Sequence, residues 1–268
     1  MAISRLDQVL VERGLCDSRE KAKRLVLAGQ VRVNGQPARK PSDRVQPADD
    51  LTVDAPAKFV SRGGHKLEHA LEQFQINAAA LTAIDLGAST GGFTDCLLQH
   101  GAVKVFAVDV GQGQLAWKLR QDPRVVVMEK TNARYLTCKD FAPTNLQPDS
   151  SNPSGSSDAA QPAEPPADLI VVDCSFISLK KILPPAVPLL KPGGRIVALI
   201  KPQFEAGKAE ADRGRGVITD AAVHERVLAE LQQFVAAQAG ICWRGVVESP
   251  LLGPAGNKEF LALIEKVR

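Results

Sequence analysis

The chain has 268 residues, 44% of them hydrophobic, and a formal net charge of +3, which allows one large and one small folded domain and excludes a largely disordered chain. Five cysteines without a CxxC pair, an N-terminus without a secretory pattern and apolar runs well short of about 18 residues predict a cytoplasmic protein with no disulfide, metal or membrane partner. Residues 1–66 hold 13 Lys and Arg against 8 Asp and Glu, whereas the rest holds 20 against 22, so the front of the chain favours a nucleic-acid partner over a merely solvated basic face.

Two short helices are predicted at the start of the chain. Residues 4–13 carry apolar side chains at i, i+3 and i+4 spacing and are followed by Gly14, a pattern typical of an amphipathic helix with a C-terminal glycine. A second helix begins after a cap at Asp17 or Ser18 and ends at Gly29. Its outward face is basic.

A hairpin follows the second helix. Residues 31–33 alternate with period two and run into Asn34-Gly35, a pair that favours a type I′ turn. Residues 51–53 are predicted to add a further strand. The first 57 residues should therefore form a small α+β domain.

This arrangement resembles the S4-like RNA-binding domain of ribosomal proteins, pseudouridine synthases and tyrosyl-tRNA synthetases. Three segments carry the resemblance: Arg5-Leu6-Asp7, Ser18-Arg19-Glu20-Lys21-Ala22 and Gly29-Gln30-Val31-Arg32-Val33-Asn34-Gly35. It implies that residues 1–57 grip structured RNA through phosphates and shape, so that affinity falls steeply with salt. The RNA-binding candidates are Arg5, Arg19, Lys23, Arg24 and Arg32.

From Thr82 onward, apolar strands alternate with helical stretches, which predicts a Rossmann-like α/β domain with a parallel sheet covered by helices on both faces. One interval, residues 142–167, is dominated by Pro, Ser, Ala and polar residues and is predicted to be a disordered insertion that can be deleted without loss of folding. The strand candidates are Ala83–Leu86, Val103–Val108, Val125–Met128, Leu169–Val172 and Ile196–Ile200.

A glycine-rich turn ends the first of these strands. Its spacing, Gly87-x-x-x-Gly91-Gly92, departs from the G-x-G-x-x-G of dinucleotide sites, and Asp85 stands in front of it. This departure favours S-adenosylmethionine, whose ammonium group the carboxylate would orient, while Asp109 at the end of the second strand would accept hydrogen bonds from ribose hydroxyls. The cofactor-binding candidates from this reasoning are Asp85, Gly87, Ser89, Thr90, Gly91, Gly92, Phe93 and Asp109.

Three later segments, 172–178, 200–205 and 253–260, are interpreted as polar strand ends, where open α/β sheets place their sites. Lys201 directly follows an apolar strand, so we expect its amine to be partly desolvated and its pKa to be lowered, which would suit a base.

The whole chain apart from 142–167 resembles the TlyA haemolysin-type rRNA methyltransferases, whose catalytic domain is similar to the FtsJ-type 2′-O-methyltransferases. The resemblance is carried by residues 61–67, 85–94, 113–117, 131–134, 173–178 and 201–205. It implies cytidine 2′-O-methylation in 16S or 23S rRNA, with ribosomal RNA or subunits as partners and Asn132 as a further cofactor residue. It also implies a Lys-Asp-Lys-Glu catalytic tetrad, which maps onto Lys66, Asp173, Lys201 and Glu259.

A methyl transfer to a ribose hydroxyl explains these residue types, because the hydroxyl is a weak acid that needs a base or a cation beside it. We expect Lys201 to serve the hydroxyl, Asp173 and Glu259 to orient Lys201, and Lys66 to add positive charge. Residues 58–66 then form a junction between the S4-like domain and a methyltransferase domain over 67–268. The alternatives are an NAD-dependent oxidoreductase, a non-catalytic RNA-binding factor and, from the family's historical name alone, a haemolysin.

Overall fold

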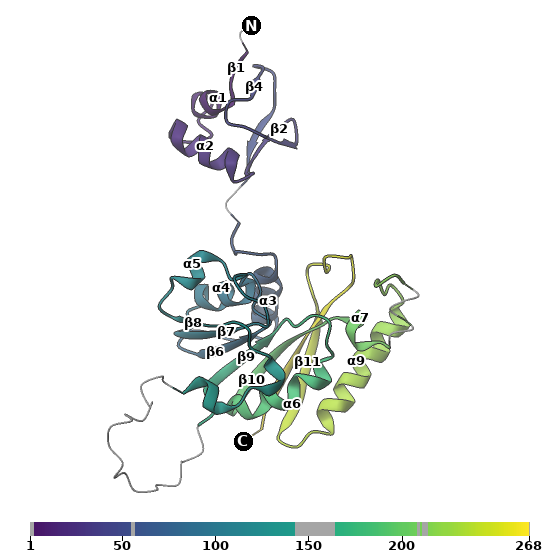
Figure 1. Ribbon diagram of the computed structural model, residues 1–268. Coiled ribbons are helices and arrows are strands. Elements are labelled where there is room, and N and C mark those ends of the chain that lie inside the picture. Colours follow the sequence, from purple (N-terminus) through teal and green to yellow (C-terminus); the bar gives the residue numbers. More distant parts are fainter. Residues whose placement is uncertain (1–2, 55–56, 143–163, 208–209, 211–213, 268) are drawn as a thin grey trace, which may run out of the picture. The chain divides into compact units, whose positions relative to one another are not determined.

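A computed structural model of the 268-residue chain describes all residues except 1–2, 55–56, 143–163, 208–209, 211–213 and 268. The chain divides into two compact units, Met1–Lys58 and Phe59–Arg268 (Figure 1). Most of the segment predicted as a disordered insertion, 142–167, therefore lies outside the described residues. Its described C-terminal end, Ala167, already begins a strand.

The first unit is a small α+β fold, as predicted. Asn34 and Gly35 both have positive φ, 52° and 76°, which is the backbone of a type I′ turn and confirms the predicted hairpin. Ser18 caps the second helix by accepting a hydrogen bond from the Lys21 amide. The elements are β1 (Ser4–Arg5), α1 (Leu6–Glu12), α2 (Arg19–Leu27), β2 (Val31–Val33), β3 (Gln36–Pro37), β4 (Arg44–Val45) and β5 (Leu51–Val53).

The second unit is built on a seven-stranded sheet in the order β11-β12-β10-β9-β6-β7-β8. All five predicted strands are present, and β10 starts earlier than expected, at Leu190. The five predicted strands pair in parallel, as expected, whereas β12, which was not predicted, extends the sheet by pairing antiparallel with both β10 and β11. The strands are β6 (Thr82–Leu86), β7 (Lys104–Val108), β8 (Val125–Met128), β9 (Ala167–Val172), β10 (Leu190–Ile200), β11 (Ile241–Glu248) and β12 (Phe260–Lys266).

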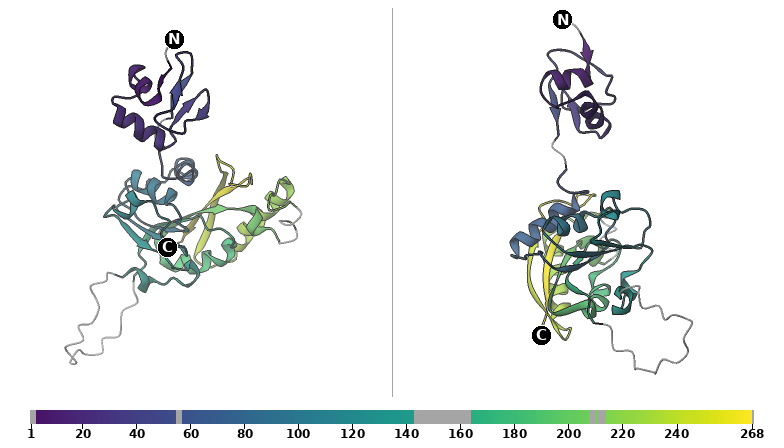
Figure 2. Two further views of the ribbon diagram at one scale, coloured as in Figure 1. Left: turned by 45° about the horizontal axis from the view of Figure 1, so that its top comes forward. Right: turned by 90° about the vertical axis from the view of Figure 1, so that its left-hand side faces the viewer.

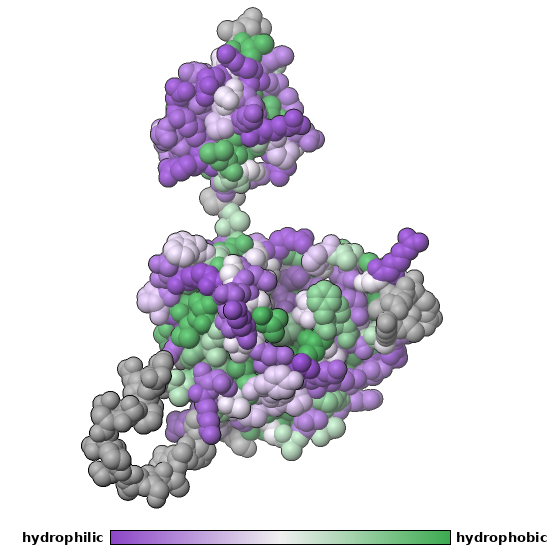
Figure 3. All heavy atoms as spheres, viewed as in Figure 1, coloured by the Kyte–Doolittle hydropathy of each residue, from purple (hydrophilic) through white to green (hydrophobic). Residues whose placement is uncertain are grey.

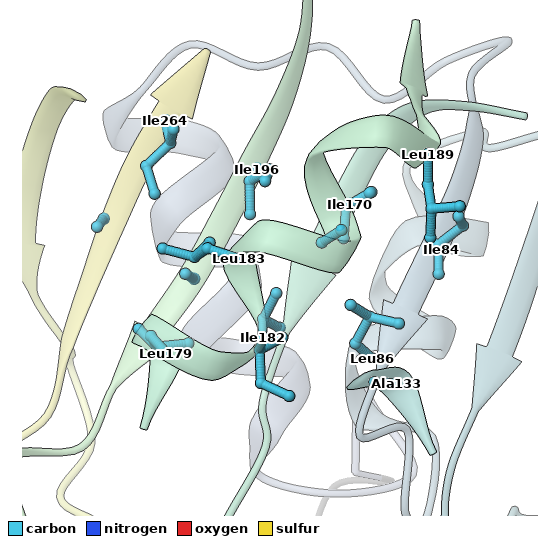
Figure 4. Close-up of a cluster of buried hydrophobic side chains, with 14 of the residues drawn as sticks. Ile84, Leu86, Ala133, Ile170, Leu179, Ile182, Leu183, Leu189, Ile196 and Ile264 are labelled. Atoms are coloured by element: carbon cyan, nitrogen blue, oxygen red, sulfur yellow. The ribbon is translucent and has the colours of Figure 1, made fainter. Parts of the chain in front are cut away.

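Helices cover both faces of this sheet (Figure 2). Alternate residues of β6 enter different cores: Ala83 belongs to a core that includes side chains of α3 and α4, whereas Ile84 belongs to a core on the opposite face that includes side chains of α6 and α9. Figure 4 shows the second of these cores, with Ile84, Ile170 and Ile196 in a row across three neighbouring strands. The helices of this unit are α3 (Gly63–Gln73), α4 (Gly92–Gln99), α5 (Trp117–Arg120), α6 (Leu183–Ala186), α7 (Pro202–Glu205) and α9 (Ala221–Ala236). Four 3₁₀ turns add to them: η1 (Ala133–Tyr135), η2 (Cys138–Phe141), η3 (Leu179–Lys181) and η4 (Val187–Leu189).

The sheet register gathers the polar segments at one edge. Leu86 pairs with Val172 at the carboxyl ends of parallel β6 and β9, and Ile200 at the end of β10 pairs with Phe260. Because β12 runs antiparallel, its first residue, Phe260, lies at that same edge. The segment 253–260 was interpreted as the end of a strand; it instead precedes β12, and the reversed strand direction is what brings it to the site.

Candidate active site

The glycine-rich turn connects β6 to α4 and has the conformation its sequence predicts. Gly87 and Gly91 have φ of 89° and 95°, the left-handed region that glycine tolerates best, and Ser89 also has positive φ. A Cβ atom on Gly87 would lie 2.8 Å from the backbone oxygen of Asp173, so glycine is also required by the closeness of the neighbouring loop. The turn therefore holds two backbone segments together at the carboxyl edge of the sheet.

Asp85 lies beneath this turn, not in it. Its side chain is fully buried, lines neither of the two main pockets, and accepts a hydrogen bond of 2.7 Å from Thr94 Oγ1. Burial raises the pKa of its carboxyl to about 7. Asp85 belongs to β6 and faces Thr94 of α4, and its Oδ1 atom has no hydrogen-bond partner among the described residues.

A pocket of about 1,210 Å³ extends from the turn along the ends of β7 and β8. Asp109 lines it and accepts hydrogen bonds from the amides of Ser89, at 2.8 Å, and Gly111, at 2.7 Å. A carboxylate held in this way keeps lone pairs for further hydroxyl donors. Asn132 lines the same pocket and caps η1 through Arg134. The predicted candidates Gly87, Ser89, Asp109 and Asn132 are brought together here.

A second pocket, of about 600 Å³, adjoins the first and shares Gly87, Ser89 and Asp173 with it. Thr90, Gly92 and Phe93 line only this smaller pocket, and Gly91 lines neither. The predicted cofactor residues are therefore divided between two adjoining pockets. Both volumes are in the usual range or above it for a small-molecule site.

All four tetrad residues line the smaller pocket. Lys201 Nζ lies 2.6 Å from Asp173 Oδ1 and donates to Ser175 Oγ at 2.8 Å. Lys66, on α3, forms its ion pair with Glu259, and the two residues are only 7% and 1% exposed. The structure thus contains two separate Lys-acid pairs. Glu259 was expected to orient Lys201, but its ion pair is with Lys66.

Two residues that the sequence did not single out, Asn257 and Glu205, hold this site in shape. Asn257 is 1% exposed; its Nδ2 donates to Gly216 O and its Oδ1 accepts from the Ile218 amide, both at 2.8 Å, which fastens residues 216–218 to the loop that carries Glu259. In the sequence, Gly256-Asn257 looks like an ordinary turn. Only its burial in the fold distinguishes it.

Glu205 braces the other side of the cleft. It accepts hydrogen bonds from Ser178 Oγ at 2.6 Å and the Leu179 amide at 2.7 Å, which ties α7 to the loop after β9, and burial raises the pKa of its carboxyl. Phe204 lies on α7 and Phe176 lies in the loop after β9, and their ring centroids are 5.0 Å apart. Phe176 is 90% exposed and has φ of 62°, so a large aromatic ring is held in solvent at the mouth of both pockets.

The basic candidates of the first unit are described separately, since the two units are distinct bodies. On the face seen in Figure 3 the surface of this unit is mainly hydrophilic. Fully buried Asp7 binds Arg5 at 3.0 Å and Arg19 at 3.3 Å, and the hydrogen bond from Arg5 holds the pKa of Asp7 below its usual value. The other three candidates lie on the surface, with Lys23 paired to Glu20, Arg32 paired to Asp54, and Arg24 exposed without an ion pair among the described residues.

The described residues contain no group of three or more His, Cys, Asp or Glu side chains that could hold a metal ion. None of the helices in that part of the chain is both long enough and apolar enough to cross a membrane.

Comparison with known proteins identifies the family of each unit. Residues 59–266 match the FtsJ-like methyltransferase family, and residues 4–51 match the S4 domain. The chain is 46% identical to the "16S/23S rRNA (cytidine-2'-O)-methyltransferase TlyA" of Mycobacterium tuberculosis, over 96% of this chain and 88% of that protein. It is 47% identical to the Bacillus subtilis protein "Putative rRNA methyltransferase YqxC", over 96% and 84%. A solved structure, "Putative hemolysin from Streptococcus thermophilus", has 42% identity and a TM-score of 0.69 and covers 100% of this chain and 90% of its own.

Proposed function

Because the chain belongs to the TlyA family of rRNA methyltransferases, with an S4 domain ahead of an FtsJ-like methyltransferase domain, we propose that it methylates the ribose 2′-hydroxyl of a cytidine in 16S or 23S rRNA. S-adenosylmethionine is the methyl donor. The observation that carries the proposal is the position of Lys201, a nearly buried cation that is fixed by Asp173 and Ser175 on the wall of a pocket.

The larger pocket suits this cofactor. Asp109 and Asn132 line this pocket, and we assign them to the ribose hydroxyls and the adenine of the cofactor. The methionine portion is assigned to the turn at Gly87, where backbone amides are accessible. Bound S-adenosylmethionine supplies a methyl group on a sulfonium, which a neighbouring oxygen can attack. Asp85, buried just beneath the turn with an unpartnered Oδ1 atom, is assigned to orienting the ammonium group of the methionine portion.

Lys201 is assigned to the ribose hydroxyl. A 2′-hydroxyl is a weak acid, so a cation fixed next to it stabilises the negative charge that develops on the oxygen as it attacks the sulfonium methyl group and releases its proton to water. Asp173 and Ser175 hold Lys201 Nζ from two sides, which removes the need to reorganise it during the reaction. Position and charge are then set before the RNA arrives.

The second ion pair, Lys66 with Glu259, is assigned to binding the target nucleotide. Lys66 is a positive charge on the same pocket, and Glu259 fixes it while keeping the buried pair neutral. We assign Lys66 to the phosphate or ribose of the target nucleotide and Glu259 to the orientation of Lys66. The S4 unit is assigned to gripping rRNA within a ribosomal subunit through Arg5, Arg19, Lys23, Arg24 and Arg32.

The test is a direct assay of the product. Full-length protein is incubated with S-adenosylmethionine and with 16S or 23S rRNA, free or in ribosomal subunits, and the digested RNA is analysed by mass spectrometry. The expected product is 2′-O-methylcytidine, formed only when cofactor and protein are both present. Methylation of a base, or no methylation of any of these RNAs, would contradict the proposal.

A further inference from the structure

Gln203 is a partly buried residue that carries a buried polar atom which the mechanism above does not use. Gln203 lies on α7, two residues after Lys201. Its Oε1 atom is buried and has no hydrogen-bond partner among the described residues. Buried acceptors in native proteins are almost always satisfied, and Gln203 is a residue that lines a pocket, so its unsatisfied oxygen indicates that a ligand in this pocket donates a hydrogen bond to it.

The position of Gln203 in the pocket limits which part of a nucleotide it can meet. It shares the smaller pocket with Lys201, where the ribose hydroxyl is assigned, and with the rings of Phe176 and Phe204. The base is attached to the carbon next to the one that bears the 2′-hydroxyl, so a ribose held at Lys201 carries its base into the same pocket. Aromatic faces stack on bases, and an amide beside them meets the base edge.

We propose that Gln203 reads the Watson–Crick edge of the target cytosine, with Oε1 accepting a hydrogen bond from the 4-amino group and Nε2 donating to ring atom N3. This inference rests on the proposed function. An amide presents an acceptor and a donor side by side, and the edge of cytosine presents the matching donor and acceptor. Because the target base must leave its helix to enter a pocket, its edge is free for such a contact.

Gln203 also lines the larger pocket, so its amide could instead serve the cofactor. The two roles differ in what they make the enzyme sensitive to. An amide that reads the base makes catalysis depend on the 4-amino group, whereas one that binds the cofactor changes the Kd for S-adenosylmethionine. A site built to bind a substrate amine discriminates against the analogue that lacks it.

The experiment compares two RNAs and three proteins. The RNAs are an rRNA fragment that the wild type methylates and the same fragment with zebularine, which lacks only the 4-amino group, at the target position. The proteins are the wild type, Gln203→Leu, and the matched surface exchange Gln232→Leu on α9, whose side chain is exposed. For each pair kcat/KM is measured, together with the Kd for S-adenosylmethionine by calorimetry and the Tm.

In the wild type and in Gln232→Leu, removal of the 4-amino group should lower kcat/KM about tenfold. For Gln203→Leu, kcat/KM on the cytidine fragment should be about tenfold lower than for the wild type and nearly equal to that on the zebularine fragment, with an unchanged Kd for the cofactor. An additional variant, Gln203→Glu, keeps the acceptor oxygen and should keep the preference for the amine.

Equal rates on both RNAs in the wild type would overturn the inference, and so would a tenfold preference that persists in Gln203→Leu. A weakened cofactor Kd with the preference unchanged would assign Gln203 to the cofactor instead. These results would leave the proposed function intact, because cytidine would still be methylated. Failure of the wild type to methylate any cytidine would overturn both.

Discussion

Replacement of Lys201 by alanine tests the proposed chemistry most directly. The side chain is 10% exposed and is held between Asp173 Oδ1 at 2.6 Å and Ser175 Oγ at 2.8 Å. General acid-base catalysis by one positioned side chain typically contributes about 10²–10⁴-fold, and removal of one preorganised electrostatic donor costs about 10²–10³-fold. We therefore expect kcat to fall by about 10²–10⁴-fold.

Cofactor binding should change far less. Lys201 lines only the smaller pocket, whereas the residues assigned to the cofactor's ribose and adenine line the larger one. The Kd for S-adenosylmethionine should stay within about threefold of wild type, a difference of roughly 0.7 kcal/mol. The assay is single-turnover methyl transfer to rRNA with radiolabelled cofactor, alongside calorimetry for the cofactor.

The matched control is Lys191→Ala. Lys191 also pairs with an aspartate, Asp168, at 2.8 Å, but its side chain is 46% exposed and it lies far along β10 from Lys201, near the start of the strand. Its loss should leave kcat unchanged. If Lys201→Ala retained more than a tenth of wild-type kcat, or if it abolished cofactor binding, the assignment of Lys201 to the ribose hydroxyl would be refuted.

Three further changes test the supporting structure. Burial raises the pKa of Asp85 from 3.8 to about 7, so the free energy of unfolding should fall by about 1.4 kcal/mol per pH unit as pH rises from about 4 to 7. Asp85→Asn should remove this fall, which urea unfolding across the same pH range would measure. Arg24→Ala removes an exposed cation that has no ion pair among the described residues, so rRNA affinity should drop and the slope of log K against log salt should become shallower by roughly 0.7–0.9, whereas an unchanged slope would exclude a phosphate contact. Asn257→Ala leaves the carbonyl of Gly216 and the amide of Ile218 without their hydrogen-bond partner, so it should lower the free energy of unfolding by about 2–3 kcal/mol. It should also reduce kcat without raising the Kd for S-adenosylmethionine; wild-type activity would show that these two hydrogen bonds are not needed for catalysis.

Local signals in the sequence were sufficient for most of the fold. The caps and glycines around α2, the Asn34-Gly35 turn and the apolar runs of β6 to β10 act over a few residues, so each could be predicted before the structure was known. The strands β11 and β12 were missed. Arg244 and Gly245 interrupt the apolar residues of β11, and every second residue from Arg244 to Glu248 is exposed. The antiparallel pairing of β12 with β10 joins residues about 60 to 70 positions apart. No short-range pattern encodes such a pairing.

The site was predicted unevenly for the same reason. Lys201 could be found because it directly follows a buried strand, and Gly87 because a positive φ was required there. By contrast, the partners of each charge depend on long-range packing. Lys66 and Glu259 are separated by 193 positions and meet only because β12 reverses direction. The bracing roles of Asn257 and Glu205 have no sequence signal beyond a turn and a polar helix end.

The pairing of the tetrad has a consequence for how each member should be tested. Two lysines can be nearly buried on one small pocket because each has its own carboxylate, which offsets much of the cost of removing a charge from water. Removal of one member therefore leaves an unpaired charge as well as deleting a function. For the pair of Lys66 and Glu259, of which Glu259 is almost completely buried, Lys66→Met alone should destabilise the fold more than the double change Lys66→Met with Glu259→Gln. If the double variant regains stability but not methyl transfer, the pair is needed for catalysis and not only for folding; if it regains both, its charges serve the fold alone.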